Sequence, residues 1–111
     1  MEFVKGDTIE LEITANTDIT GWKIRAEFYD INGISVKLAS ANSGGSDDEI
    51  SIDNVSEGIF TITCPAGATT GFDNQSFLEI EREDANGKIL TILPKSSINM
   101  LDEQITWTDP S

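Results

Sequence analysis

The chain has no histidine among its 111 residues and only one cysteine, Cys64. Histidine is the commonest general base and the commonest zinc ligand, so its absence excludes Ser-His-Asp catalysis, Cys-His catalysis and histidine-based metal sites. One cysteine forms no internal disulfide, and small secreted domains usually rely on such bridges. The sequence therefore predicts a protein made in a reducing cytosol that is not an enzyme and carries no cofactor.

Basic residues are also scarce. Seven lysines and arginines stand against twenty aspartates and glutamates, for a net charge of −13. Such a chain repels a phosphate backbone, so nucleic acid is not expected as a partner. The simpler interpretation of this acidity is a solvated surface that resists aggregation, and the alternative is a dedicated surface for cations or for a basic partner.

Long apolar runs are missing as well. Hydrophobic residues make up 38% of the chain, but no run approaches the roughly 18 residues needed to span a bilayer, and no leader-like segment opens the sequence. The length is that of one ordinary domain. We therefore expect a single soluble domain over residues 1–111, with no membrane partner.

What the chain does have is regular alternation of apolar and polar residues. From Trp22 to Tyr29 the two kinds alternate without a slip, and residues 8–14 repeat the pattern. A period of two is typical of a half-buried β-strand, because successive side chains point to opposite faces. Asn-Gly pairs within residues 30–33 and 84–87 predict two tight hairpin turns, because both residue types tolerate a positive φ.

The rest of the chain predicts further strands and few other elements. An acidic, flexible loop is expected at 43–49, and a helical turn or irregular crossover at 66–72. Seven or eight strands without a long helical segment predict an all-β protein, an antiparallel β-sandwich, because a parallel sheet needs long crossovers. The other expected strands are a lead-in at 1–5, segments at 34–38, 50–52, 60–64, 76–82 and 88–93, and a last strand after Pro94.

The apolar phases of these strands indicate one common core, because a two-sheet sandwich interleaves its inner faces. Cys64 extends the apolar face of Phe60 and Ile62, so we interpret it as a buried thiol rather than a nucleophile. The residues expected to be buried together are Ile9, Leu11, Trp22, Ile24, Phe28, Phe60, Ile62 and Ile80.

Two groups of carboxylates raise the question of chemistry. In the first group, two glutamates point to the same side of a strand, a geometry that the catalytic carboxylates of glycosidases can have. Such an enzyme needs one carboxyl group with a raised pKa, and a small sandwich offers little burial to raise it. The other supplies hard oxygen ligands for calcium without the Asp-x-Asp-x-Asp-Gly spacing of a calcium loop. We interpret both as solvated acidic surface and expect no metal, with weak calcium binding left open. The pairs are Glu10 with Glu12 and Glu79 with Glu81, and the calcium candidates are Asp47, Asp48, Glu49 and Asp53.

Three residues are candidates for contact with a partner: Tyr29, Ile105 and Trp107. Trp107 follows an otherwise finished sandwich, where it either closes the core or is presented to a partner, as interface aromatics often are. Ile105 and Trp107, together with the strand edge near Gly6-Asp7, are also the candidates for self-association, because terminal strands usually lie at sheet edges.

Several segments taken together carry a family resemblance, covering roughly residues 3–101. They are Val4–Leu11, Ile19–Phe28, Gly58–Ile62, Pro65–Phe72 and the hairpin from Leu78–Arg82 to Lys88–Ile92. In this order they resemble the small immunoglobulin-like β-sandwich proteins of tailed phages and prophages, similar to the N-terminal domain of phage baseplate upper proteins.

The resemblance implies an immunoglobulin-like fold and a role as a virion component in tail, baseplate or neck assembly. The implied partners are other phage particle proteins or further copies of the chain, and the implied location is the virion, or the host cytoplasm before assembly. The single domain favours an adaptor or accessory part over receptor contact. Two alternatives stay open: a carbohydrate- or cell-surface-binding module in which Tyr29, Phe72 or Trp107 stacks on sugars, and a calcium-stabilised adhesion domain.

Overall fold

The computed structural model describes residues 1–102, which form eight β-strands. The only helical element in this part of the chain is a 3-10 turn at Ala41–Ser43. The expectation of an all-β protein with seven or eight strands is therefore confirmed. The strands are β1 Glu2–Val4, β2 Ile9–Thr14, β3 Lys23–Asp30, β4 Ser35–Ala39, β5 Ile50–Asn54, β6 Ile59–Cys64, β7 Gln75–Glu83 and β8 Ile89–Leu101.

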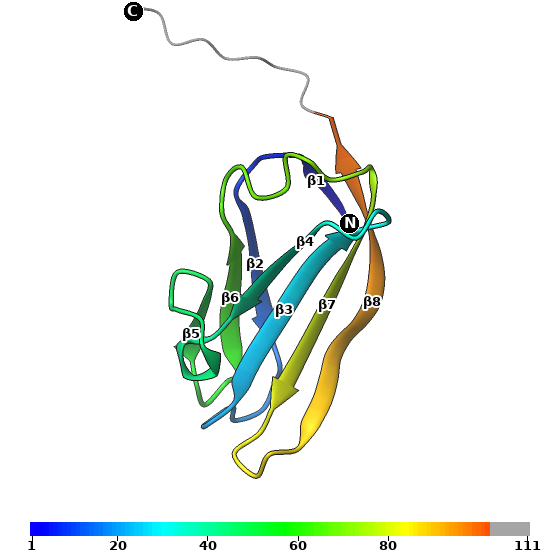
Figure 1. Cartoon of the computed structure of the whole chain (residues 1–111). Helices are drawn as coiled ribbons and strands as arrows, with labels where there is room; N and C mark the ends of the chain where they lie inside the picture. Colours follow the sequence, from blue (N-terminus) through cyan, green and yellow to red (C-terminus); the bar gives the residue numbers. More distant parts are fainter. Residues whose placement is uncertain (103–111) are drawn as a thin grey trace, which may run out of the picture.

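The strands form two sheets that face each other as a sandwich (Figure 1). The larger sheet has the order β1-β8-β7-β3-β4, and the smaller has the order β2-β6-β5. The strand pairs are antiparallel, as expected, except that β1 runs parallel to β8. This exception arises because β1 and β2 lie at the edges of different sheets, and the chain crosses between them at Gly6 and Asp7.

Strand β8 departs from the predicted pattern. The sequence predicts one strand ending at Leu93 and another after Pro94, but a single strand continues through the proline. The prediction was wrong because β8 is an edge strand over most of its length. Strand β1 pairs only with Asn99–Leu101, so no strand in residues 1–102 needs an N–H from Pro94 on that side. Two register shifts next to Ile80 on β7 accommodate the irregularity.

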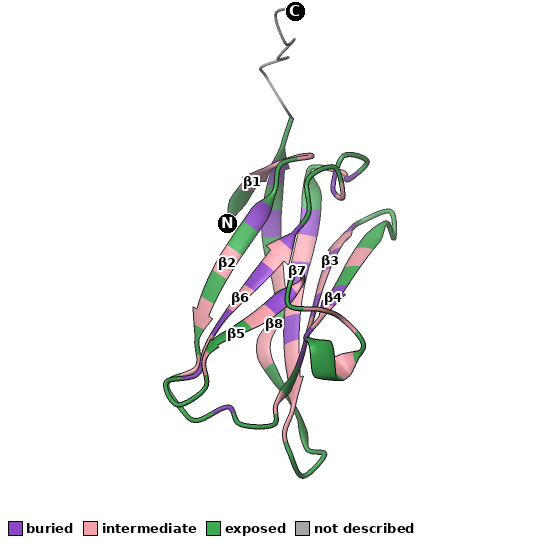
Figure 2. Ribbon diagram, turned by 90° about the vertical axis from the view of Figure 1, so that its left-hand side faces the viewer, coloured by how far each residue is buried: buried purple, intermediate pink, exposed green. Residues whose placement is uncertain are grey.

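The core lies between the sheets, and buried positions alternate along the central strands (Figure 2). Two residues predicted to be buried, Leu11 and Trp22, are only half-buried and pack against the margin of the core. Leu11 lies on an edge strand, and Trp22 precedes β3 with the Arg82 guanidinium 4.3 Å from its ring centroid. The predictions confirmed as buried are Ile9, Ile24, Phe28, Phe60, Ile62 and Ile80.

The segment 66–72 is an irregular crossover made of turns, which was one of the two predicted alternatives. It is anchored from inside, because Thr69 and Phe72 are both buried. The Gly6 N–H donates to Thr69 Oγ1 at 2.9 Å, which ties the crossover to the link between β1 and β2. A buried Phe72 cannot stack on a sugar ring, so that part of the carbohydrate alternative is wrong.

Candidate interaction surfaces

Tyr29 lies half-buried on the outer face of the larger sheet. Its ring centroid is 5.4 Å from that of Phe77, the residue directly opposite on β7, with 35° between the planes. The Lys95 ammonium lies 4.3 Å from the Phe77 centroid, which is a cation–π distance. These three side chains form a small aromatic platform with a cationic end.

A carboxylate holds the Tyr29 phenol in place. The hydroxyl donates to Glu79 Oε1 at 2.7 Å. This hydrogen bond, followed by burial and by the negative charges of Glu79 and Glu27, raises the pKa of Tyr29 to about 12. Glu27 and Glu79 face each other directly across β3 and β7, where like charges repel. The phenol therefore stays a neutral donor at physiological pH beside an acidic row.

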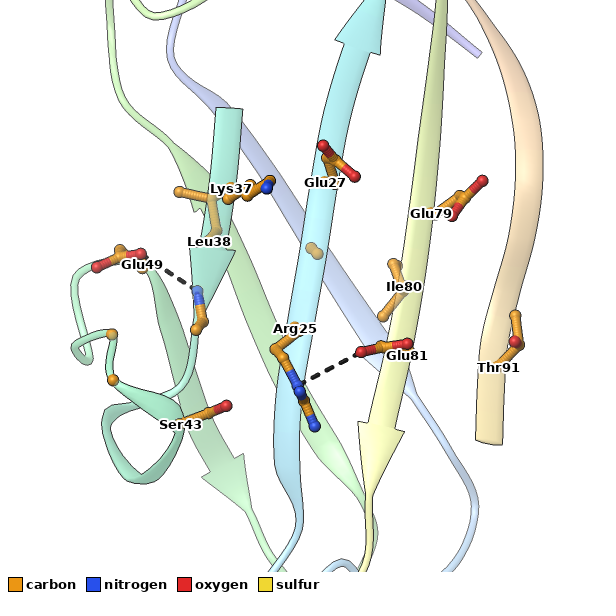
Figure 3. A pocket seen from close by; sticks show the side chains of 14 residues that line it. Arg25, Glu27, Lys37, Leu38, Ser43, Glu49, Glu79, Ile80, Glu81 and Thr91 are labelled. Atoms are coloured by element: carbon orange, nitrogen blue, oxygen red, sulfur yellow. Dashed lines mark hydrogen bonds and ion pairs between the residues drawn. The ribbon is translucent and has the colours of Figure 1, made fainter. Parts of the chain in front are cut away.

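Beside this platform, the outer face is hollowed over β4, β3 and β7 (Figure 3). The hollow has a volume of about 480 Å³. Arg25 reaches toward β7, with its Nε 3.5 Å from Glu81 Oε1 and a terminal nitrogen 3.4 Å from Glu83 Oε1. Lys37 lies opposite Glu27 in the β3–β4 register. Charges of both signs thus line the hollow, which suits a polar or charged partner segment better than an apolar ligand.

The loop at 43–49 forms one wall of the hollow, and the sequence did not predict this position. Gly45 lies so close to Ala39 that a Cβ would collide with the Ala39 carbonyl oxygen. The Ala39 N–H donates to Glu49 Oε1 at 3.2 Å, and the Ala39 carbonyl accepts from Ser46 N–H at 3.2 Å. The loop therefore covers the end of the β4 edge and is not merely a flexible tip. The Gly44-Gly45 pair is the feature of the sequence that could have predicted this contact, because glycine also permits the close approach of two backbone segments.

The acidic residues of this region face different partners. Asp53 accepts hydrogen bonds from the hydroxyls of Ser51 at 2.9 Å and Thr61 at 2.6 Å. Glu49, as described, faces the β4 edge. Among residues 1–102, no three cysteine or carboxylate side chains are grouped as a metal-binding set. The calcium alternative therefore has no ligand cluster in the described part of the chain.

Cys64 ends β6 on the inner face and is buried, as predicted. Burial raises the pKa of its thiol, which disfavours the reactive thiolate. Glu10 and Glu12 lie exposed on β2, so this carboxylate pair has the solvent-facing position that was expected. These groups offer no enclosed pair of carboxylates with different environments, which is what acid–base chemistry would require.

Ile105 and Trp107 lie outside the described residues, so their role in contact stays a prediction. Sequence reasoning missed a different exposed apolar segment, which consists of Ile89 and Leu90 at the start of β8. Ile89 is 54% exposed and Leu90 is 41% exposed, and Figures 1 and 2 show the β7–β8 hairpin extending past the smaller sheet. A usable signal was present, because residues 85–101 contain no aspartate or glutamate in a chain with twenty of them.

Residues 1–102 contain no helix with the length and apolarity that a membrane crossing requires. Comparisons of the chain with protein-family models, with curated proteins and with solved structures find no match.

Proposed function

We propose that the chain is a non-enzymatic structural or assembly module of a phage or prophage particle, acting by protein–protein contact in a tail, baseplate or neck. Its locations are then the virion and the host cytoplasm before assembly. The resemblance of its segments to phage immunoglobulin-like proteins supports this proposal. The strand order supports the immunoglobulin-like part, because β2-β6-β5 and β8-β7-β3 correspond to the B-E-D and G-F-C rows of that fold.

The observation that carries the proposal is an exposed apolar segment of an edge strand on a strongly acidic protein. A net charge of −13 opposes indiscriminate association. Ile89, opposite Glu83, and Leu90, opposite Arg82, are nevertheless exposed on the two faces of the same edge strand, in a stretch without acidic residues. Exposed apolar residues on an edge strand that has no pairing neighbour favour contact with another chain. The combination of a repulsive surface and a locally apolar edge favours contact at one place on the molecule.

The proposal is tested by asking whether the protein is part of a particle. Particles purified from the source by density gradient should contain the chain at a fixed ratio to a major tail protein, and deletion of its gene should stall assembly at a defined stage. Terminase, portal or tape-measure genes beside its own gene would agree with this setting. Particles that lack the chain and assemble normally without it would refute the proposal.

A carbohydrate-binding role is the second candidate, and the Tyr29–Phe77 pair favours it because aromatic rings on an open face can stack on sugars. A glycan array followed by titration of any hit would test this role. Phe77→Ala should abolish binding, whereas Phe3→Ala, which removes a ring that packs on Phe28, should leave a correctly folded protein able to bind. Absence of any glycan hit would exclude this candidate.

A further inference from the structure

The edges of the two sheets are unequally protected against pairing with another chain. Natural sheets guard exposed edges with charge, short strands, bulges or covering loops. Strand β1 has only three residues, and β2 carries the exposed Glu10 and Glu12. The end of β4 is covered by the loop at 43–49, and β5 carries Asp53 at a register shift. Each of these four edges thus has a recognisable protection.

The lower half of β8 has such protection only at its far end, where a register shift between Thr91 and Leu93 and the residue Pro94 interrupt the edge, so Ile89–Thr91 carry neither a charge nor a bulge. Strand β1 pairs only with Asn99–Leu101, so no other strand in the described residues covers the outer side of Ile89–Leu93. We call Ile89–Leu93 the β8 free edge. The Asp84 N–H donates to the Lys88 carbonyl at 2.9 Å, which makes this pair hydrogen-bonded across the hairpin. Because such pairs alternate in an antiparallel ladder, the backbone groups of Ile89 and Thr91 face away from β7. The edge therefore presents unused donors and acceptors between apolar side chains.

Charge favours a second copy of the chain at this edge. The acid-free residues 85–101 include two lysines, Lys88 and Lys95. The nearest carboxylates on β7 are already paired, with Glu81 3.5 Å from Arg25 and Glu83 3.5 Å from Lys23. Another molecule with a charge of −13 would therefore meet less repulsion here than over the acidic edge of β2.

We propose that the β8 free edge pairs antiparallel with the same edge of a second copy, forming a two-fold symmetric dimer. With the symmetry axis beside Thr91, the Thr91 N–H of each copy donates to the Thr91 carbonyl of the other. The two five-stranded sheets become one continuous sheet, and Ile89 is covered. The pairing occupies the β8 free edge of both copies, and Pro94 limits the length of the pairing. The assembly therefore closes at two copies.

This inference rests on the proposed assembly role and names its partner as a second copy. The edge is short, and its pairing buries less than the about 800 Å² per partner of a standard interface. The dimer should therefore be weak and form in the micromolar to millimolar range. Particle fractionation does not test it, because a monomeric chain would also be found in a particle.

The experiment measures mass by sedimentation velocity over a wide concentration range, with four proteins compared. Thr91→Pro removes the outward N–H, and Ile89→Lys adds charge to the β8 free edge. Ile31→Lys is the matched control, because Ile31 is 52% exposed and lies at the opposite hairpin. Circular dichroism verifies that each variant is folded. We expect the wild type and Ile31→Lys to dimerise alike, and Thr91→Pro and Ile89→Lys each to weaken the dimer at least about tenfold.

Amide exchange identifies the surface independently of mutation. The amides of Ile89 and Thr91 should gain protection as protein concentration rises, whereas the amides on β2 should not. A wild type that stays monomeric throughout would overturn the inference. Undiminished dimers of folded Thr91→Pro and Ile89→Lys would overturn it too, and would indicate a different contact such as residues 103–111. If one of these variants does not fold, the other variant and the amide protection decide the outcome.

Discussion

Two hairpin turns at opposite ends of the sandwich share the same sequence pattern, Asp-x-Asn-Gly. At one end, Asp30 Oδ1 accepts from the N–H groups of Asn32 at 3.0 Å and Ile34 at 2.9 Å. At the other, Asp84 Oδ1 accepts from the N–H groups of Asn86 and Lys88, both at 2.9 Å. The local pattern thus produces the same turn in two places.

The second carboxylate oxygen distinguishes the two turns. Asp30 Oδ2 accepts from the Asp73 N–H at 2.8 Å, and Asp30 is only 3% exposed. Asp84 Oδ2 instead lies 3.3 Å from Arg82, within the projecting β7–β8 hairpin. The carboxylate of the first turn is therefore bonded to a distant part of the chain and closes its end of the sandwich, whereas the carboxylate of the second bonds only within its own hairpin. The same type of turn thus occurs at one end of the sandwich with a hydrogen bond to a distant segment and at the other end without one.

The largest contrast should come from apolar truncations near the two ends. Phe28→Ala, two residues before the Asp30 turn, removes a fully buried ring and should cost about 3–5 kcal/mol. Leu90→Ala, two residues after Lys88, should cost about 1 kcal/mol or less because this side chain is already 41% exposed. Urea denaturation followed by circular dichroism measures both costs. Equal costs would show that the projecting hairpin is packed as tightly as the core.

The carboxylates of the turns should also differ when removed. Asp30→Ala leaves three backbone N–H groups without their acceptor, one of them in the distant segment at Asp73. Asp84→Ala leaves two, both within its own turn. Because a buried unsatisfied donor is costly, we expect Asp30→Ala to lower stability roughly twice as much as Asp84→Ala in the same denaturation experiment. The reverse order would mean that the closed end does not depend on Asp73.

The contribution of Asp30 to stability should also depend on pH. Burial by itself would raise the pKa of Asp30, but the N–H donors of Asp73, Ile34 and Asn32 outweigh it and lower the pKa below its ordinary value. A lowered folded-state pKa contributes stability above the ordinary value of 3.8, and this contribution is lost as the pH falls through the folded-state pKa. The stability gap between the wild type and Asp30→Asn should therefore be large at neutral pH and shrink as the pH falls below 3.8 and through the folded-state pKa. A gap that is constant with pH would contradict this cause.

The turn glycines should behave alike despite their different surroundings. Gly33 and Gly87 have φ values of +88° and +82°, and an added Cβ meets nothing within 4 Å at either position. Gly33→Ala and Gly87→Ala should each cost about 1 kcal/mol, because only the backbone strain changes. Gly71→Ala is the control, because Gly71 has no positive φ and the added Cβ only touches Ile34 at 3.9 Å. Clearly unequal costs at the two turns would show that tertiary contacts modify the turn itself.

The smallest effect on stability is expected at the outer face next to the closed end. Tyr29 is the only tyrosine, so phenolate absorbance reports it alone. Its titration should have a midpoint near the pKa of about 12, and Glu79→Gln should move the midpoint down toward 10.0. The variant should otherwise unfold like the wild type. A wild-type midpoint near 10.0 in folded protein would mean that the Glu79 hydrogen bond does not form.

Local sequence rules predicted much of the fold. The alternation through Ile24, Ala26 and Phe28 fixed the inward face of β3, because each side chain's direction depends only on its place in the strand. The same rule failed for Ile34, which has the expected phase but lies in the turn and is 44% exposed. Leu90 is exposed for a related reason, because the smaller sheet does not extend to cover it. Burial depends on what lies opposite, and local sequence contains no information about that.

The candidate surfaces were predicted less well than the fold. Tyr29 was identified as outward-facing, but its partners Phe77, Glu79 and Lys95 come from strands far along the chain. Gly45 was interpreted as a flexible tip because its contact with Ala39 requires the loop to fold back over β4. The β8 free edge was missed because an edge is defined by the absence of a neighbouring strand.

By itself, the sequence determined that this protein is built from strands and tight turns, and that its polar faces are acidic. Period-two alternation and Asn-Gly pairs act over a few residues, so they need no knowledge of the rest of the chain. Only the tertiary structure decided that β1 pairs parallel with the end of β8, and that Asp30 is buried where Asp84 is not. These outcomes depend on contacts between residues such as Asp30 and Asp73, which come together only when the two sheets form.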